Sequence, residues 1–180
     1  MNAKERTVLT THRDCPGRLV PTGDPVTIPA HTFVTLTQAL GGNYTVTWNG
    51  NMVRIDGTDA DAIGMEPCRL DFEPAPSGEI VEQQVWDALR TIYDPEIPVD
   101  LVNLGLVYGV DIEPSSGVVT VRMTLTAPAC GMGPVLMGDV KYRVGQVPNV
   151  RRVEVELVFD PPWNRDMMSE EAQLETGMFY

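Results

Sequence analysis

The sequence contains few residues that bind soft metals. Its 180 residues include three cysteines and two histidines, and Cys15, Cys68 and Cys130 lie far apart, with no Cys-x-x-Cys pair. A resident zinc or iron-sulfur site usually draws on closely spaced thiolates and histidines. An odd number of distant cysteines is also not the pattern of a disulfide framework. We therefore expect no permanently bound cofactor and no structural disulfide.

Basic residues are scarce as well. Thirteen lysines and arginines stand against 25 aspartates and glutamates, so the net charge is -12 and the pI is near 4.4. Such a surface repels both a phosphate backbone and an anionic membrane. No apolar run reaches the length of about 18 residues that a membrane span needs, and no signal-peptide pattern opens the chain. We expect a cytoplasmic protein with no nucleic-acid or membrane partner.

A stretch rich in proline and glycine, residues 73–79, separates two regions of different character. Residues 1–74 alternate between apolar and polar side chains, and Asn49-Gly50 lies between two such runs, a pattern typical of a tight β-hairpin. The first region is therefore predicted to be a small β-rich module of the barrel or meander type. Residues 75–180 are predicted to form a second domain.

The spacing of the apolar residues changes in the second region. Apolar residues at helical spacing begin at Val81 and again after Pro134, and three alternating runs indicate strands. The last strand, near residues 150–160, is expected to point Phe159 inward. A short acidic helix in the tail is expected to be capped by Asp166 or Ser169. The order α-β-β-α-β predicts an α+β fold, with a three-stranded sheet covered by helices.

Cys130 is predicted to lie in a short loop that leads into a helix beginning near Pro134. A helix N-terminus favours a thiolate, the form that binds metals and attacks electrophiles. Lowering a thiol pKa from about 8.5 to about 7 takes roughly 2 kcal/mol, whereas a helix end usually supplies about 0.3 to 1 kcal/mol. The helix end alone thus leaves Cys130 partly protonated. Position alone is equally compatible with a small buried hydrophobic residue.

Asp94, Glu96 and Asp100 lie within seven residues of one another on an irregular, proline-interrupted segment. They could bind a hard cation or act as acid and base. The simpler interpretation is a turn that ends a helix and carries solvated charges. Trp163, after two prolines, is read either as an anchor for a partner or as a lid on the core.

Three blocks in this order carry a resemblance to a known family: YDPEIPVDLVNLGLVY, TLTAPAC and FDPPW. They resemble the family that contains the SUF-system protein SufT, the phenylacetate-pathway protein PaaD and a eukaryotic cytosolic iron-sulfur targeting subunit. The likeness covers about residues 79–165, and the N-terminal region and the tail look like those of SufT within this family. The matching positions include Asp94, Glu96, Thr126, Cys130, Asp160 and Trp163.

The resemblance implies an auxiliary role in iron-sulfur cluster assembly rather than an enzymatic reaction, so no catalytic residue is assigned. The family's functional cysteine falls on Cys130, which would handle iron or a cluster transiently. A single thiol cannot hold a four-thiolate cluster alone, so the cluster would be shared with a second chain, a client or a small thiol. The implied partners are an assembly scaffold and apo iron-sulfur clients, and a homodimer would bring two Cys130 thiols together.

Two other hypotheses remain open at this point. The protein could be an adaptor that joins scaffold and client without touching metal, in which case the surface near Trp163 matters more than Cys130. It could also be a thiol-dependent transferase or hydrolase, which requires a base beside Cys130.

Overall fold

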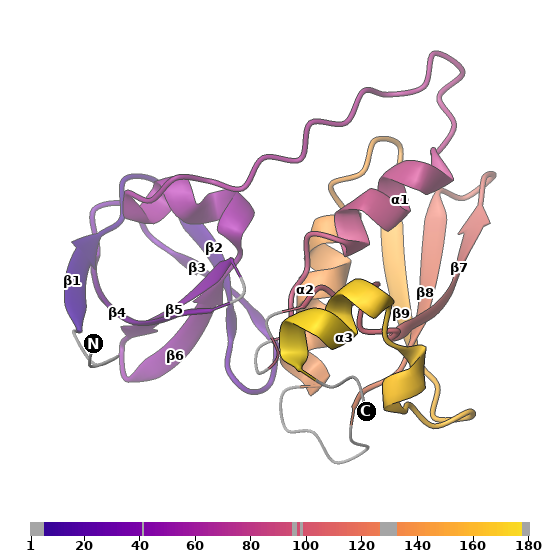
Figure 1. Ribbon diagram of the computed structural model, residues 1–180. Coiled ribbons are helices and arrows are strands. Elements are labelled where there is room, and N and C mark those ends of the chain that lie inside the picture. The colour runs from indigo at the N-terminus through magenta and orange to yellow at the C-terminus, as the bar shows by residue number, and fades with distance from the viewer. Residues whose placement is uncertain (1–5, 41, 95–96, 98, 127–132, 178–180) are drawn as a thin grey trace. The chain divides into compact units, whose positions relative to one another are not determined.

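The computed structural model describes residues 6–40, 42–94, 97, 99–126 and 133–177, and it divides the chain into two compact units, Met1–Leu70 and Asp71–Tyr180 (Figure 1). Both helices and strands are present, which confirms the predicted mixed class. Cys130 and Glu96 lie outside the described residues. None of the described helices is long and apolar enough to cross a membrane.

The first unit is a six-stranded sheet in the order β1-β4-β5-β6-β2-β3, followed by a 3-10 helix, η1. Its elements are β1 (Thr7–Thr10), β2 (Cys15–Leu19), β3 (Pro25–Ile28), β4 (Phe33–Leu40), β5 (Asn43–Trp48), β6 (Asn51–Ile55) and η1 (Gly57–Ile63). The predicted hairpin is present between β5 and β6. Asn49 and Gly50 have φ values of 50° and 77°, the conformation that this tight turn requires.

The core of the first unit is formed by side chains from alternate positions of these strands. Val46 of β5 pairs with Val53 of β6 across the sheet, and both are fully buried. Cys15 of β2 belongs to the same cluster and has no exposed surface. Burial raises the pKa of the Cys15 thiol to about 11, because the thiolate would lose its hydration. Cys15 is therefore a packing residue.

The second unit contains a three-stranded sheet, in which β7 pairs antiparallel with β8 and β8 pairs parallel with β9. Its elements are α1 (Glu82–Leu89), β7 (Val107–Glu113), β8 (Val118–Met123), α2 (Gly133–Val144), β9 (Arg152–Leu157), η2 (Arg165–Met167) and α3 (Glu170–Thr176). Helix α2 makes the crossover that a parallel strand pair needs. Ser169 caps α3 by accepting a hydrogen bond from the Ala172 amide, as one of the two predicted caps.

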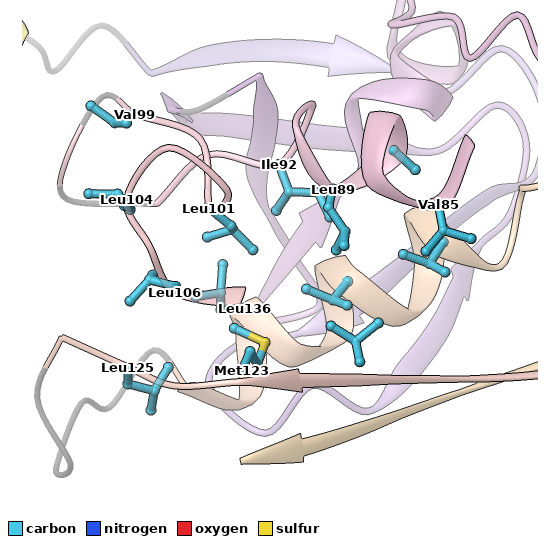
Figure 2. Close-up of a cluster of buried hydrophobic side chains, with 14 of the residues drawn as sticks. Val85, Leu89, Ile92, Val99, Leu101, Leu104, Leu106, Met123, Leu125 and Leu136 are labelled. Atoms are coloured by element: carbon cyan, nitrogen blue, oxygen red, sulfur yellow. The ribbon is translucent and has the colours of Figure 1, made fainter. Parts of the chain in front are cut away.

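Helices α1 and α2 bury one face of this sheet in a continuous apolar core (Figure 2). Val85 and Leu89 of α1 share this core with Leu136 of α2 and Met123 of β8, and the segment before β7 adds Leu101, Leu104 and Leu106. At about 1.5 to 3 kcal/mol for each fully buried large side chain, this cluster is the main stabilising contribution to the second unit.

The predicted inward position of Phe159 is wrong. Strand β9 ends at Leu157, and the Phe159 side chain is 41% exposed. The amide of Val158 still donates to the carbonyl of Met123 at 2.8 Å. Pro161 and Pro162 have no N–H to continue the ladder, so the chain leaves the sheet before the alternating pattern can place Phe159 in the core.

Burial of Cys15 predicts a protected thiol. A pKa about two units above its ordinary value lowers the thiolate fraction by about 100-fold at neutral pH, and the side chain is also shielded. We expect iodoacetamide to modify Cys15 at least about tenfold more slowly in the native chain than in guanidinium, measured by peptide mass spectrometry. The half-buried Cys68 is the internal comparison. Equal rates for Cys15 in the folded and unfolded chain would contradict its place in the core.

Candidate functional site

The parallel pairing of β8 with β9 brings two of the three sequence blocks to one edge of the sheet. Both strands run in the same direction, so Met123 and Leu157, their paired last residues, lie side by side. The segment 124–126, which leads toward Cys130, and the segment 158–163 therefore start from the same edge. We call this region, together with residues 99–106, the motif edge.

Backbone hydrogen bonds connect the first block to the other two. The amide of Thr124 donates to the carbonyl of Leu106 at 2.8 Å, so the loop before β7 contacts the segment after β8. The indole Nε1 of Trp163 donates to the carbonyl of Leu104 at 2.7 Å. Residues 99–106, 124–126 and 158–163 are thus held together although about 20 to 60 residues separate them in the sequence.

Trp163 is part of the internal packing of the motif edge. Its ring is half-buried against the core of the second unit, and its only donor is engaged by Leu104. The hydroxyl of Tyr108 donates to the carbonyl of Pro161 at 2.6 Å and holds the same segment at a second position. Of the two interpretations of Trp163, these contacts favour the lid on the core.

Gly105 lets two chain segments approach closely at the motif edge. It has a φ of 77°, and a Cβ at this position would overlap the carbonyl oxygen of Met167. The amide of Ser169 donates to the carbonyl of Asn103 at 2.8 Å beside it. A glycine at position 105 is therefore required for the segment around η2 to pack on the first block.

The predicted acidic residues close turns in the first block. Oδ1 of Asp94 accepts a hydrogen bond from the Ile97 amide at 3.0 Å, and the Asp94 amide donates to the Val99 carbonyl at 3.1 Å. Asp100 accepts from both the backbone amide and the side-chain amide of Asn103, at 3.1 and 2.6 Å.

The prediction of solvated charges is wrong for Asp100, which is 8% exposed. Its carboxylate organises the loop before β7, because two donors from Asn103 compensate for its burial. The spacing of an aspartate and an asparagine three residues later was the signal in the sequence for this role.

The residues next to the Cys130 segment are well packed on both sides. Leu125 and Leu136 belong to the buried core, and Thr126 is half-buried. Thr124 is fully buried, and its hydroxyl oxygen has no hydrogen-bond partner within the described part of the chain. Both the end of β8 and the start of α2 are therefore fixed to the core.

Helix α2 also carries two buried charged residues that the sequence reading did not single out. Asp139 has no exposed surface and Arg143 is 1% exposed, one helical turn later. A guanidinium nitrogen of Arg143 donates to the carbonyl of Thr91 at 2.8 Å, which links α2 to the end of α1 just before the acidic block. The signal for them in the sequence is an acidic and a basic residue four positions apart, next to the apolar positions Leu136 and Val140 of the same helix.

No group of three or more histidine, cysteine, aspartate or glutamate side chains that could hold a metal ion is found among the described residues. His12 and Cys15, three positions apart in the sequence, belong to the first unit, where Cys15 is buried. Asp160 and Phe159 are exposed at the motif edge, and Asp160 forms no ion pair with a described residue.

Part of the second unit matches a known protein family. The model of the family described as iron-sulfur cluster assembly protein matches residues 82–157. The chain is 51% identical over 96 residues to an Fe-S protein maturation auxiliary factor of Porphyromonas gingivalis. The aligned region covers 53% of this chain and 90% of that protein. It is 45% identical over 87 residues to the Fe-S protein maturation auxiliary factor SufT of Staphylococcus aureus, covering 48% of this chain and 98% of the relative.

A solved structure shares the same architecture. The crystal structure of a domain of unknown function from Bacillus anthracis is 36% identical, with a TM-score of 0.51, and the match covers 54% of this chain and 92% of that domain. These proteins consist of little beyond the matched part, so they leave no room for a counterpart of the six-stranded first unit. The likeness of that unit to a SufT extension stays a prediction from the sequence.

The contacts of Trp163 predict that it stabilises the second unit. Trp163→Phe removes the hydrogen bond to Leu104 and should cost about 1 kcal/mol, whereas Trp163→Ala also removes packing and should cost about 3 kcal/mol. The measurement is urea unfolding followed by the NMR signals of core amides such as Val121. Phe159→Ala, at an exposed neighbour, is the control and should stay within about 0.5 kcal/mol of the wild type. An equal loss in Phe159→Ala and Trp163→Ala would overturn the lid assignment.

Proposed function

This chain belongs to the iron-sulfur cluster assembly protein family, and we propose on that premise that it is an auxiliary factor in the maturation of iron-sulfur proteins. The observation that carries this conclusion is the match to named maturation factors over nearly their whole length. The partners implied are an assembly scaffold and the apo-proteins that receive clusters. The role is auxiliary rather than enzymatic.

Cys130 is the residue to which we assign the handling of iron or of a cluster. It is the only cysteine of the second unit, and it follows the Thr-Leu-Thr sequence at the end of β8, where the family resemblance places the functional cysteine. A thiolate is the usual protein ligand of iron-sulfur clusters. The cluster is cargo in this proposal, and its other ligands come from a second chain, a client or a small thiol.

The packed flanks of this segment support that role. A residue that binds a cluster works best when the surrounding structure is rigid. The described residues on either side of this segment, Leu125 and Leu136, are buried in the core. The hydrogen bonds among residues 99–106, 124–126 and 158–163 tie the other two blocks to the same edge. The described residues of all three blocks thus lie in one region of the second unit.

Client docking is the second function that an observation favours. Trp163 is engaged with the core, whereas the other four residues of the third block are exposed, and among these Phe159 carries the aromatic side chain and Asp160 the charge. Tyr108 and Trp163 fix this segment at Pro161 and at its end, so a partner that binds there pays little ordering cost. We therefore move the proposed docking contact from Trp163 to these two side chains.

The thiolate role is tested by the iron and acid-labile sulfide bound per chain after anaerobic reconstitution. We expect the wild type to hold a cluster, and Cys130→Ser to lose at least about nine-tenths of it, because no other thiol lies in the second unit. Cys68→Ser is the matched control and should retain the wild-type content. A cluster retained in Cys130→Ser would exclude Cys130 as ligand, and no cluster in any variant would leave the adaptor function.

The adaptor function is tested in cells that lack the native protein, by the activity of a cluster-dependent enzyme. If docking alone matters, the double variant Phe159→Ala/Asp160→Asn should lower that activity several-fold while Cys130→Ala leaves it unchanged. If Cys130 carries the cargo, Cys130→Ala should lower it as well. Glu154→Gln, an exposed acidic change on β9, is the control for a general charge effect. Full activity in the double variant would refute the docking contact.

A further inference from the structure

A small cleft lies at the end of the second unit's sheet opposite to the motif edge. It has a volume of about 200 Å³ and is formed by three segments: the chain before α1, the turn between β7 and β8, and the connection from α2 to β9. Its lining residues are Gly78, Ile80, Pro114, Ser115, Gly117, Asn149, Val150 and Arg151. Because β8 begins at Val118 and β9 at Arg152, the cleft lies at the amino ends of the two parallel strands.

Arg151 is the charged residue of this cleft. Its side chain forms no hydrogen bond or ion pair with any residue that the structure describes, whereas the adjacent Arg152 forms an ion pair with Glu154 at 2.6 Å. The backbone amide of Arg151 donates to the Gly117 carbonyl at 2.8 Å, so the residue is firmly placed. Arg151 is exposed, so its guanidinium is accessible to a ligand.

Gly117 makes room for the Arg151 side chain. A Cβ at position 117 would lie 2.8 Å from Cγ of Arg151, so the aliphatic part of the arginine lies directly over the glycine. This contact limits the directions that the guanidinium can take. A cation held in this way loses less conformational entropy when it binds a ligand than a free surface arginine does.

Other polar groups line the cleft near Arg151. The Ser115 hydroxyl has a single long contact, 3.5 Å to Glu113 Oε1, and can rotate toward a ligand. The side-chain amide of Asn149 donates to the Glu79 carbonyl at 3.1 Å, which fixes the chain before α1 as a wall of the cleft. Glu79 and Glu113 are exposed residues next to this wall. Their carboxylates repel anions and so lower the affinity for any anion that Arg151 does not bind directly.

We propose that this cleft binds a small oxyanion, the phosphate or carboxylate group of a small molecule. The volume is below the roughly 300 to 1,000 Å³ typical of pockets for larger organic ligands, and it corresponds to the liquid volume of about seven water molecules. The planar guanidinium of Arg151 matches two oxygens of either group. The site is independent of the proposed function, because it lies at the other end of the sheet from the motif edge.

The test is a titration of the full chain, labelled with ¹⁵N, at constant ionic strength with sodium phosphate, sodium acetate or sodium chloride. We expect saturable shifts of the amides of Gly78, Ser115 and Gly117, with a millimolar dissociation constant, for phosphate or acetate but not for chloride. The anion with the lower dissociation constant, phosphate or acetate, identifies the class of group that the cleft binds. Arg151→Gln should weaken binding by at least about tenfold, since it removes the charge-assisted hydrogen bonds.

Two further variants keep the proposal falsifiable. Arg152→Gln removes one positive charge at the neighbouring position and should change the dissociation constant by less than about twofold. Arg151→Lys keeps the charge without the planar fork and should bind between the wild type and Arg151→Gln. Shifts that do not saturate, shifts equal in Arg151→Gln, or an equal loss in Arg152→Gln would each overturn the site.

Discussion

The parallel pairing of β8 with β9 is the constraint on which the arrangement of the second unit depends. It requires a crossover on one face of the sheet, which α2 provides, and the apolar side of α2 then covers that face. It also brings the carboxyl ends of both strands to one edge. The segments after Met123 and Leu157 are about 30 residues apart in the sequence and adjacent in space for this reason.

This geometry separates two ends of the sheet with different chemistry. At the carboxyl ends, three sequence blocks are joined by hydrogen bonds to Leu104, Leu106 and Pro161, and the segment that carries Cys130 starts there. At the amino ends, turns and the chain before α1 enclose a polar cleft beside Arg151. A change at one end can therefore be studied without direct contact with the other.

Periodicity predicted much of the fold because burial repeats along the chain. Val85 and Leu89 on a helix, the alternating residues of β8 and the Asn49-Gly50 hairpin all follow from local rules, and each is present in the structure. The rules failed at Phe159, where two following prolines end the ladder, and at Asp100, where burial depends on the distant fold. Local sequence carries no information on which side chains a later segment will cover.

The sequence by itself determined the strands, the helices, the acidic balance and the family blocks that point to Cys130, because these depend on residue type and spacing alone. Only the tertiary structure decided that Trp163 contacts the core through Leu104, that Phe159 and Asp160 remain exposed, and that Arg151 borders a cleft without an acidic partner among the described residues. The physical reason is that each of these properties depends on contacts between segments far apart in the chain, which exist only once the parallel strands have paired.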